Sequence, residues 1–110
     1  DIEPDELAMD IPYDENLLIL DVRKGNEFAE GHVKDALNLP LGDMIDIAQI
    51  AGLEENKNIY VHCGGGYRSL IASSILKSHG YHNIRNIAGG WKKIKEQKNI
   101  STEKEGSVLN

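Results

Sequence analysis

The pattern of apolar residues divides the chain into short strand-like segments. Leu17–Val22 is an apolar run broken only by an acid near its end, and Asn58–His62 is a second run of strand length. Short, nearly continuous runs are typical of strands buried on both faces of a parallel sheet. Ala36–Leu39 and Ile84–Ile87 alternate apolar and polar residues. They predict two further strands.

Between the strands, apolar residues recur at helical spacing, with glycine or proline near the ends of the segments. The predicted helices are Pro4–Met9, Lys24–Glu30, Asp43–Ile50, Ser69–His79 and Trp91–Lys98. The face expected to be buried on the fourth of them consists of Leu70, Ile71, Ile75 and Leu76. Gly80 follows that helix, where a left-handed cap favours glycine.

Strands that alternate with helices predict an α/β fold, with a central, mostly parallel sheet flanked by helices on both faces. The chain has 110 residues, the size of one domain. We expect this domain to cover residues 1–97 and residues 98–110 to be a polar C-terminal tail or a linker remnant. The chain starts at Asp1 rather than Met, so it can be a piece of a larger protein.

Composition narrows the functional classes. A net charge of −6 and the lack of a basic stripe argue against a nucleic-acid partner. No stretch has the roughly 20 apolar residues of a membrane span, and no leader marks secretion. The single cysteine excludes an internal disulfide or a CxxC pair. We therefore expect a reducing, cytoplasmic setting.

That cysteine, Cys63, lies in the most informative segment. It follows a predicted strand and precedes a predicted helix, with Gly64, Gly65 and Gly66 directly after it. Glycines let backbone N–H groups curl inward as an anion-binding nest, and the helix N-terminus adds positive potential. Such surroundings favour the reactive thiolate, and the lack of side chains predicts an open mouth above the sulfur. The competing interpretation is a small buried hydrophobic residue, which the setting disfavours.

Charged residues near this loop leave alternatives open. Arg68 lies at the unfavourable, positive end of a helix and needs an anion, which could be the Cys63 thiolate, a substrate oxyanion or a carboxylate such as Asp21. Asp21 either caps the next helix or orients Arg68 and the loop from behind. Arg23 is most simply interpreted as a surface partner of Glu27, four residues on, and with Asp21 it is also a candidate residue for supporting the loop from behind.

The four histidines match no zinc pattern, so no metal site is predicted. His62 adjoins Cys63, but successive strand residues point to opposite faces, which makes it a poor partner for the thiol. His32 fits a structural hydrogen bonder better than a catalytic base.

Several short motifs follow one another in a recognisable order. They are Leu20-Asp21-Val22-Arg23, Glu27-Phe28, Glu30-Gly31-His32-Val33, Ala36-Leu37-Asn38-Leu39-Pro40, Val61-His62-Cys63 with Gly66-Tyr67-Arg68-Ser69, and Ala88-Gly89-Gly90-Trp91. Together they resemble the rhodanese family over about residues 4–97. The chain departs from the family pattern at Asp35, where glycine is common, and at Trp91, which commonly comes a few positions later.

The resemblance implies sulfur transfer. Cys63 would be the nucleophile, and the N–H groups of the loop would hold its persulfide; the loop residues are Gly64, Gly65, Gly66, Tyr67, Arg68 and Ser69. The donor would be thiosulfate or a thiol persulfide such as glutathione persulfide, and the acceptor cyanide, a thiol or a protein. No metal or organic cofactor is implied. The alternative is a non-catalytic regulatory or interaction module, a role of family members that typically lack the cysteine.

Loop details refine these expectations. Four residues separate Cys63 from Arg68. Related cysteine phosphatases have five, so we expect no phosphatase activity. Arg68 is the only formal charge in the loop, which predicts weak binding of the thiosulfate dianion and a preference for thiol persulfides. The loop also resembles those of rhodanese domains fused to metallo-β-lactamase-fold persulfide dioxygenases, so such a fused domain is a possible partner.

Overall fold

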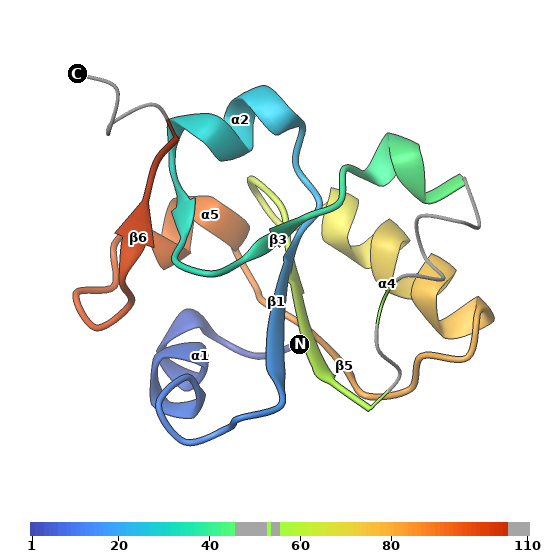
Figure 1. Ribbon diagram of the computed structural model, residues 1–110, viewed down its shortest axis with the longest axis horizontal. Coiled ribbons are helices and arrows are strands. Elements are labelled where there is room, and N and C mark those ends of the chain that lie inside the picture. Colours follow the sequence, from blue (N-terminus) through green and yellow to red (C-terminus); the bar gives the residue numbers. More distant parts are fainter. Residues whose placement is uncertain (46–52, 54–55, 106–110) are drawn as a thin grey trace.

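The computed structural model describes residues 1–45, 53 and 56–105. Its centre is a four-stranded parallel sheet with the strand order β3-β1-β4-β5 (Figure 1). The strands are β1 (Leu17–Asp21), β3 (Leu37–Asn38), β4 (Asn58–His62) and β5 (Ile84–Asn86). β1 and β4 run side by side along their whole length, from Leu17 opposite Asn58 to Asp21 opposite His62. The predicted parallel sheet is confirmed.

Helices cover both faces of this sheet, as the sequence predicts. On one face lie η1, a 3-10 helix over Leu41–Ile45, and α4 (Arg68–Ser78); on the other lie α1 (Pro4–Asp10) and α5 (Gly90–Ile94). α2 (Gly25–Glu30) lies at the carboxyl end of the sheet (Figure 1). Each face has its own buried core. The α/β fold with helices on both sides is therefore confirmed.

Alternation along β4 sends its side chains into the two cores in turn. Ile59 and Val61 pack on the α4 side together with Cys63, while Tyr60 packs on the side of α1 and α5. Because strand side chains alternate, His62 belongs to the same face as Tyr60. The prediction that His62 and Cys63 point to opposite faces is confirmed.

The buried face of α4 differs from the prediction. Its inner residues are Ser69, Ala72, Ser73 and Leu76. Leu70 is 48% exposed and Ile71 is 42% exposed, so their predicted burial is wrong. The register is set by the loop before the helix, since Ser69 must face the sulfur of Cys63, 3.7 Å from its hydroxyl. Residues at i+3, i+4 and i+7 from Ser69 then also turn inward.

The predicted C-terminal tail is wrong for part of its length. Ile100 is only 5% exposed, and β6 (Thr102–Glu103) pairs antiparallel with β2 (His32–Val33). Figure 1 shows β6 beside β2 at the edge of the molecule. The pairing joins segments about 70 residues apart, which local periodicity cannot reveal. The boundary at residue 97 itself stays a prediction.

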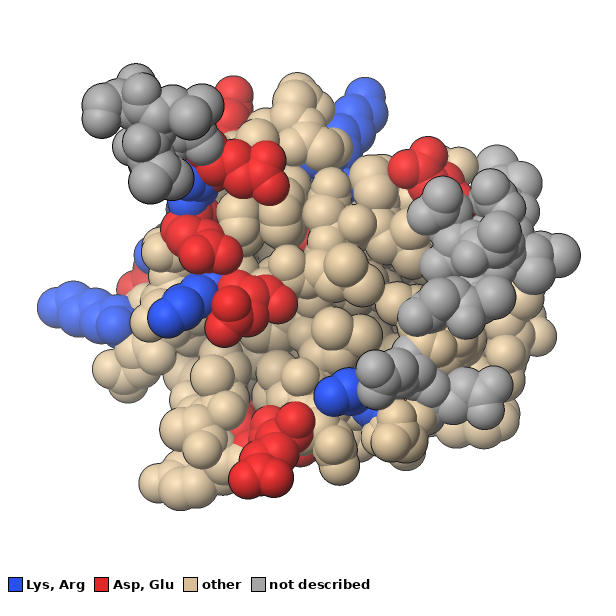
Figure 2. Space-filling model, viewed as in Figure 1, with Lys and Arg blue, Asp and Glu red and all other residues tan. Residues whose placement is uncertain are grey.

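The predicted helix Asp43–Ile50 falls largely outside the described residues, and its described start belongs to η1. In the part of the chain that the structure describes, no helix is long and apolar enough to cross a membrane. Figure 2 shows basic and acidic side chains interspersed on one face of the protein.

Candidate active site

Cys63 directly follows β4, at the carboxyl edge of the sheet, and the loop after it leads into α4. Two backbone bonds from α5 hold the start of the loop: Trp91 N donates to Cys63 O at 2.6 Å, and Lys92 N donates to Gly64 O at 3.2 Å. Cys63 is 1% exposed, so the sulfur lies at the bottom of the loop. The thiol is thus less exposed than the predicted open mouth implies, while the absence of side chains above it stays a prediction.

The sulfur is surrounded by hydrogen-bond donors. Gly66 N donates to Sγ at 3.1 Å, and the Ser69 hydroxyl lies 3.7 Å from Sγ. Burial alone raises the pKa of the Cys63 thiol, but the N–H groups of Ser69, Gly66 and Gly65 and the Ser69 hydroxyl outweigh it, so the pKa is lowered. Donors to an anion stabilise that anion. The geometry therefore favours the thiolate at this position.

Two glycines are required by this geometry. Gly66 has a φ of +104°, which turns its N–H toward the sulfur and which side chains rarely permit. Gly90 has a φ of +58°, and a Cβ there would overlap the carbonyl oxygen of Cys63. The sequence analysis singled out Gly64–Gly66 as a loop and Gly89-Gly90 as part of a matching segment, but the close approach of Gly90 to Cys63 is a tertiary contact.

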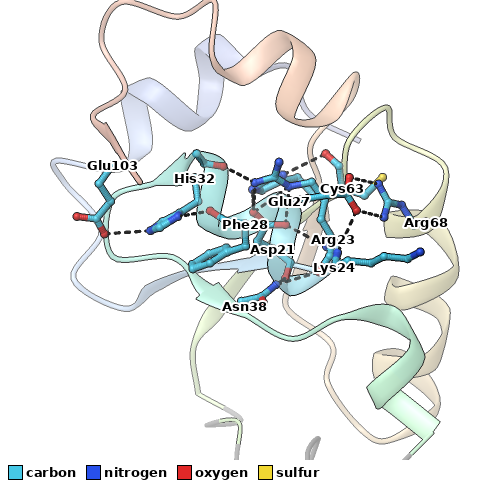
Figure 3. Close-up of polar contacts among 12 residues, drawn as sticks. Asp21, Arg23, Lys24, Glu27, Phe28, His32, Asn38, Cys63, Arg68 and Glu103 are labelled. Atoms are coloured by element: carbon cyan, nitrogen blue, oxygen red, sulfur yellow. Dashed lines mark hydrogen bonds and ion pairs between the residues drawn. The ribbon is translucent and has the colours of Figure 1, made fainter. Parts of the chain in front are cut away.

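Arg68 forms a bidentate ion pair with Glu27 of α2. Arg68 Nη1 donates to Glu27 Oε1 at 2.7 Å and Nη2 donates to Oε2 at 3.1 Å (Figure 3). The bonds from Arg68 lower the pKa of Glu27 to about 2. Glu27 is therefore the carboxylate that compensates Arg68, and the suggestion of Asp21 in that role is wrong. The hydrogen bond to Glu27 and, to a smaller extent, Cys63 raise the pKa of Arg68, so the suggested Cys63 thiolate also stabilises this charge. Glu27 was missed as a site residue, although its place in the Glu27-Phe28 motif was a usable signal.

Asp21 and Arg23 form a buried pair with each other. Arg23 Nη2 donates to Asp21 Oδ2 at 2.8 Å and to Gly31 O at 2.6 Å, and the guanidinium lies 4.8 Å from the ring centroid of Trp91. Arg23 is only 3% exposed. The predicted surface pair of Arg23 with Glu27 is therefore wrong. Asp21 is not the N-cap of α2 either, since that position is Lys24.

The buried histidines lie among structural contacts. His62 Nδ1 lies 3.2 Å from Cys63 O, and its Nε2 lies 3.7 Å from Asp21 Oδ2 but makes no hydrogen bond to a described residue. Burial lowers the pKa of His62. His32 Nδ1 lies 2.6 Å from Phe28 O, which agrees with a structural hydrogen bonder. Among the described residues, no group of three or more His, Cys, Asp or Glu side chains could hold a metal ion.

The predicted loop residues thus take three kinds of position. Gly65, Gly66 and Ser69 surround the sulfur, while Gly64 lies next to Arg68 and Glu27. Tyr67 is 76% exposed and points away from the core. What the arrangement offers chemically is a stabilised thiolate in a ring of backbone donors.

Comparisons with known proteins agree with this geometry. The family model of the rhodanese-like domain matches residues 3–97. A protein of Schizosaccharomyces pombe named putative thiosulfate sulfurtransferase, mitochondrial, is 34% identical over 71% of this chain and 63% of its own length. A sulfurtransferase of Allochromatium vinosum is 30% identical over 82% of both chains.

The fold has a solved counterpart as well. The solution structure of a rhodanese-like domain from Anabaena superimposes with a TM-score of 0.83 and 28% identity, covering 94% of this chain and 78% of the other. The chain spans less than two thirds of the Schizosaccharomyces pombe relative.

Proposed function

The chain belongs to the rhodanese-like domain family, and from that premise we propose that it is a sulfurtransferase in which Cys63 carries the sulfur atom. The observation that carries the proposal is the ring of donors around Sγ, with the Gly66 N–H at 3.1 Å. Relatives named as sulfurtransferases support the same class of reaction. Nucleophilic catalysis needs a thiolate, and this loop stabilises one.

The reaction has two half-reactions. In the first, the Cys63 thiolate attacks the outer sulfur of a donor persulfide, RS–SH; a bond forms between Sγ and the outer sulfur, and the donor thiol leaves with the electron pair and the proton. In the second, an acceptor thiolate or cyanide attacks the outer sulfur, and Cys63 leaves as the thiolate. No net oxidation of the protein occurs, and the loop N–H groups stabilise the persulfide anion in between.

The charge at the loop favours thiol persulfides over thiosulfate as donors. Arg68 is the only formal charge in the loop, and Glu27 neutralises it through two hydrogen bonds. A dianion therefore meets no unpaired cation within the loop. Steady-state kinetics with thiosulfate and glutathione persulfide test this preference, and a clearly higher kcat/KM for thiosulfate contradicts it.

Phosphate-ester hydrolysis is not part of the proposed function. The four residues between Cys63 and Arg68 make a tighter ring than the five-residue loops of cysteine phosphatases. A single sulfur atom fits such a ring better than a tetrahedral phosphate. Turnover of an aryl phosphate that Cys63→Ser abolishes would contradict this part of the proposal.

The central experiment is intact-mass spectrometry after incubation with a sulfane-sulfur donor. We expect a gain of one sulfur atom that a thiol or cyanide then removes, and no gain in the Cys63→Ser variant. A protein that gains no sulfur from thiosulfate, glutathione persulfide or a small synthetic persulfide is instead a non-catalytic interaction module.

The setting and partners belong to the same proposal. A single thiol that forms no internal disulfide suits a reducing compartment such as the cytoplasm. Since Cys63 has no second cysteine to resolve its persulfide, the acceptor must come from outside this chain segment. A fused metallo-β-lactamase-fold partner would supply or consume glutathione persulfide, which sequencing of the complete reading frame tests.

A further inference from the structure

A groove next to the sulfur site carries an inference that rests on the proposed function and deepens it. The groove lies between α2 and α5, has a volume of about 460 Å³, and is lined by Arg23, Glu27, Glu30, Gly31, Trp91 and Lys95. We call it the α2–α5 groove. Its volume lies within the roughly 300–1,000 Å³ of small-molecule sites.

The α2–α5 groove adjoins the catalytic loop through Glu27. The Glu27 carboxylate lines the groove and also binds Arg68, and its Oε2 lies 3.9 Å from where a Cβ on Gly64 would stand. Trp91 lines the groove too, and its backbone N–H donates a hydrogen bond to the carbonyl oxygen of Cys63. In Figure 3 the Glu27 carboxylate faces Arg68, beside the sulfur of Cys63. The groove therefore borders the sulfur site at the Glu27–Arg68 ion pair, and a donor that binds in the groove would extend across this pair toward Cys63.

One guanidinium nitrogen in the groove is available to an anion. Arg23 is 3% exposed, and its Nε and Nη2 are used by Asp21 and Gly31. Its Nη1 donates no hydrogen bond to any residue that the structure describes. Asp21 offsets the charge of this guanidinium, so Nη1 can add one directed hydrogen bond to a carboxylate rather than an unpaired positive charge.

Two exposed side chains, Lys95 and Glu30, add charges of opposite sign to the groove. Lys95 is exposed and makes no ion pair with the described residues, so it adds a second cation. Glu30 is likewise exposed, without an ion pair in the described part of the chain, and offers a carboxylate to a cation. The groove thus presents N–H donors for a carboxylate and a carboxylate acceptor for an ammonium group.

We propose that the α2–α5 groove binds the zwitterionic amino-acid group of a low-molecular-weight thiol, whose sulfur atom exchanges with Cys63. Arg23 Nη1 and Lys95 bind the carboxylate, and Glu30 binds the ammonium group. Cysteine and the γ-glutamyl end of glutathione share this chemistry. Persulfides without an amino-acid group lack both contacts and lose the corresponding binding energy.

The kinetic test compares donors. Glutathione persulfide, cysteine persulfide and 2-mercaptoethanol persulfide are supplied to the wild type and to the Lys95→Gln and Glu30→Gln variants. We expect each variant to lower the kcat/KM ratio of an amino-acid persulfide to 2-mercaptoethanol persulfide by about fivefold to tenfold, through KM. The glutathione and cysteine arms identify which thiol uses the groove. Lys98→Gln and Glu96→Gln, exposed neighbours outside the groove, are matched controls that should keep the ratio.

A binding test does not depend on turnover. Trp91 is the only tryptophan of the chain and lines the groove, so its fluorescence reports occupancy. S-methylglutathione should change this fluorescence in the Cys63→Ser variant, with weaker binding after Lys95→Gln. Unchanged fluorescence together with unchanged donor ratios overturns the groove assignment. Failure of Cys63 to gain sulfur from any donor, including 2-mercaptoethanol persulfide, overturns the proposed function instead.

Discussion

The loop from Cys63 to Ser69 and the α2–α5 groove adjoin each other but are built from different parts of the chain. In the loop, backbone N–H groups of glycines supply the donors to the sulfur. In the groove, the side chains of Arg23, Glu30 and Lys95 supply the charges. For a single charged sulfur atom, backbone donors suffice. The thiol that we propose as its carrier has a carboxylate and an ammonium group, and binding these would require charged side chains.

The largest effect is expected from breaking the packing beneath the loop. In Gly90→Ala, the new methyl group overlaps the Cys63 carbonyl and displaces the loop. We expect sulfur transfer to fall by more than about 100-fold and the free energy of unfolding to drop by about 3 kcal/mol. Urea denaturation and single-turnover sulfur transfer measure the two effects. Gly42→Ala, with open space around its Cα, is the control.

The next largest effect on the rate of sulfur transfer should distinguish two glycines of the same loop, Gly66 and Gly65. Gly66 has a φ of +104° and donates to Sγ, whereas a methyl group on Gly65 meets nothing within 4 Å. Gly66→Ala should slow sulfur transfer by about tenfold to 100-fold, because the N–H donor turns away from the sulfur. Gly65→Ala should stay within about twofold of the wild type. Equal effects in the two variants would show that backbone direction is unimportant here.

The pH dependence of Cys63 follows from the same donors. Since they lower the pKa of the thiol, the reactive thiolate persists to lower pH than in an unfolded chain. Iodoacetamide alkylation should therefore show a midpoint below the value of about 8.5 for free cysteine. Ser69→Ala should move the midpoint upward, because the hydroxyl donor is lost. A cysteine-containing peptide measured in parallel is the reference, and a midpoint at or above that of the peptide contradicts the interpretation.

The smallest effect concerns Glu27, where loop and groove meet. Its pKa is about 2 instead of 4.5, so its pairing with Arg68 stabilises the fold above pH 4.5 and this contribution is lost as the pH falls toward 2. Because the side chain is 33% exposed, we expect only about 1 kcal/mol. Between pH 6 and pH 2.5, measured by urea denaturation, the loss of stability should be smaller in Glu27→Gln than in the wild type by about 1 kcal/mol. Glu96→Gln should behave like the wild type.

The positions of the helices and strands could be predicted well because their signals are local. β1 and β4 follow from apolar runs, and α4 follows from helical spacing before Gly80. The inner face of α4 could not be predicted, since apolar Leu70 and Ile71 are exposed while Ser69 and Ser73 turn inward. On α4, the placement of Ser69 beside the sulfur of Cys63 goes with an inner face that the hydrophobic pattern does not predict. The pairing of β6 with β2 was likewise hidden, because it depends on segments distant in the chain.

By itself, the sequence determined the strand, the glycine loop and the helix around Cys63, because the backbone freedom of glycine and the donors of a helix start are local properties. It also determined the family, through motifs in chain order. Only the tertiary structure decided that Arg68 is neutralised by Glu27, that Arg23 is buried against Asp21 and Trp91, and that a charged groove adjoins the loop. Those contacts join separate elements, and the partner of a charged side chain is fixed only when packing brings the elements together.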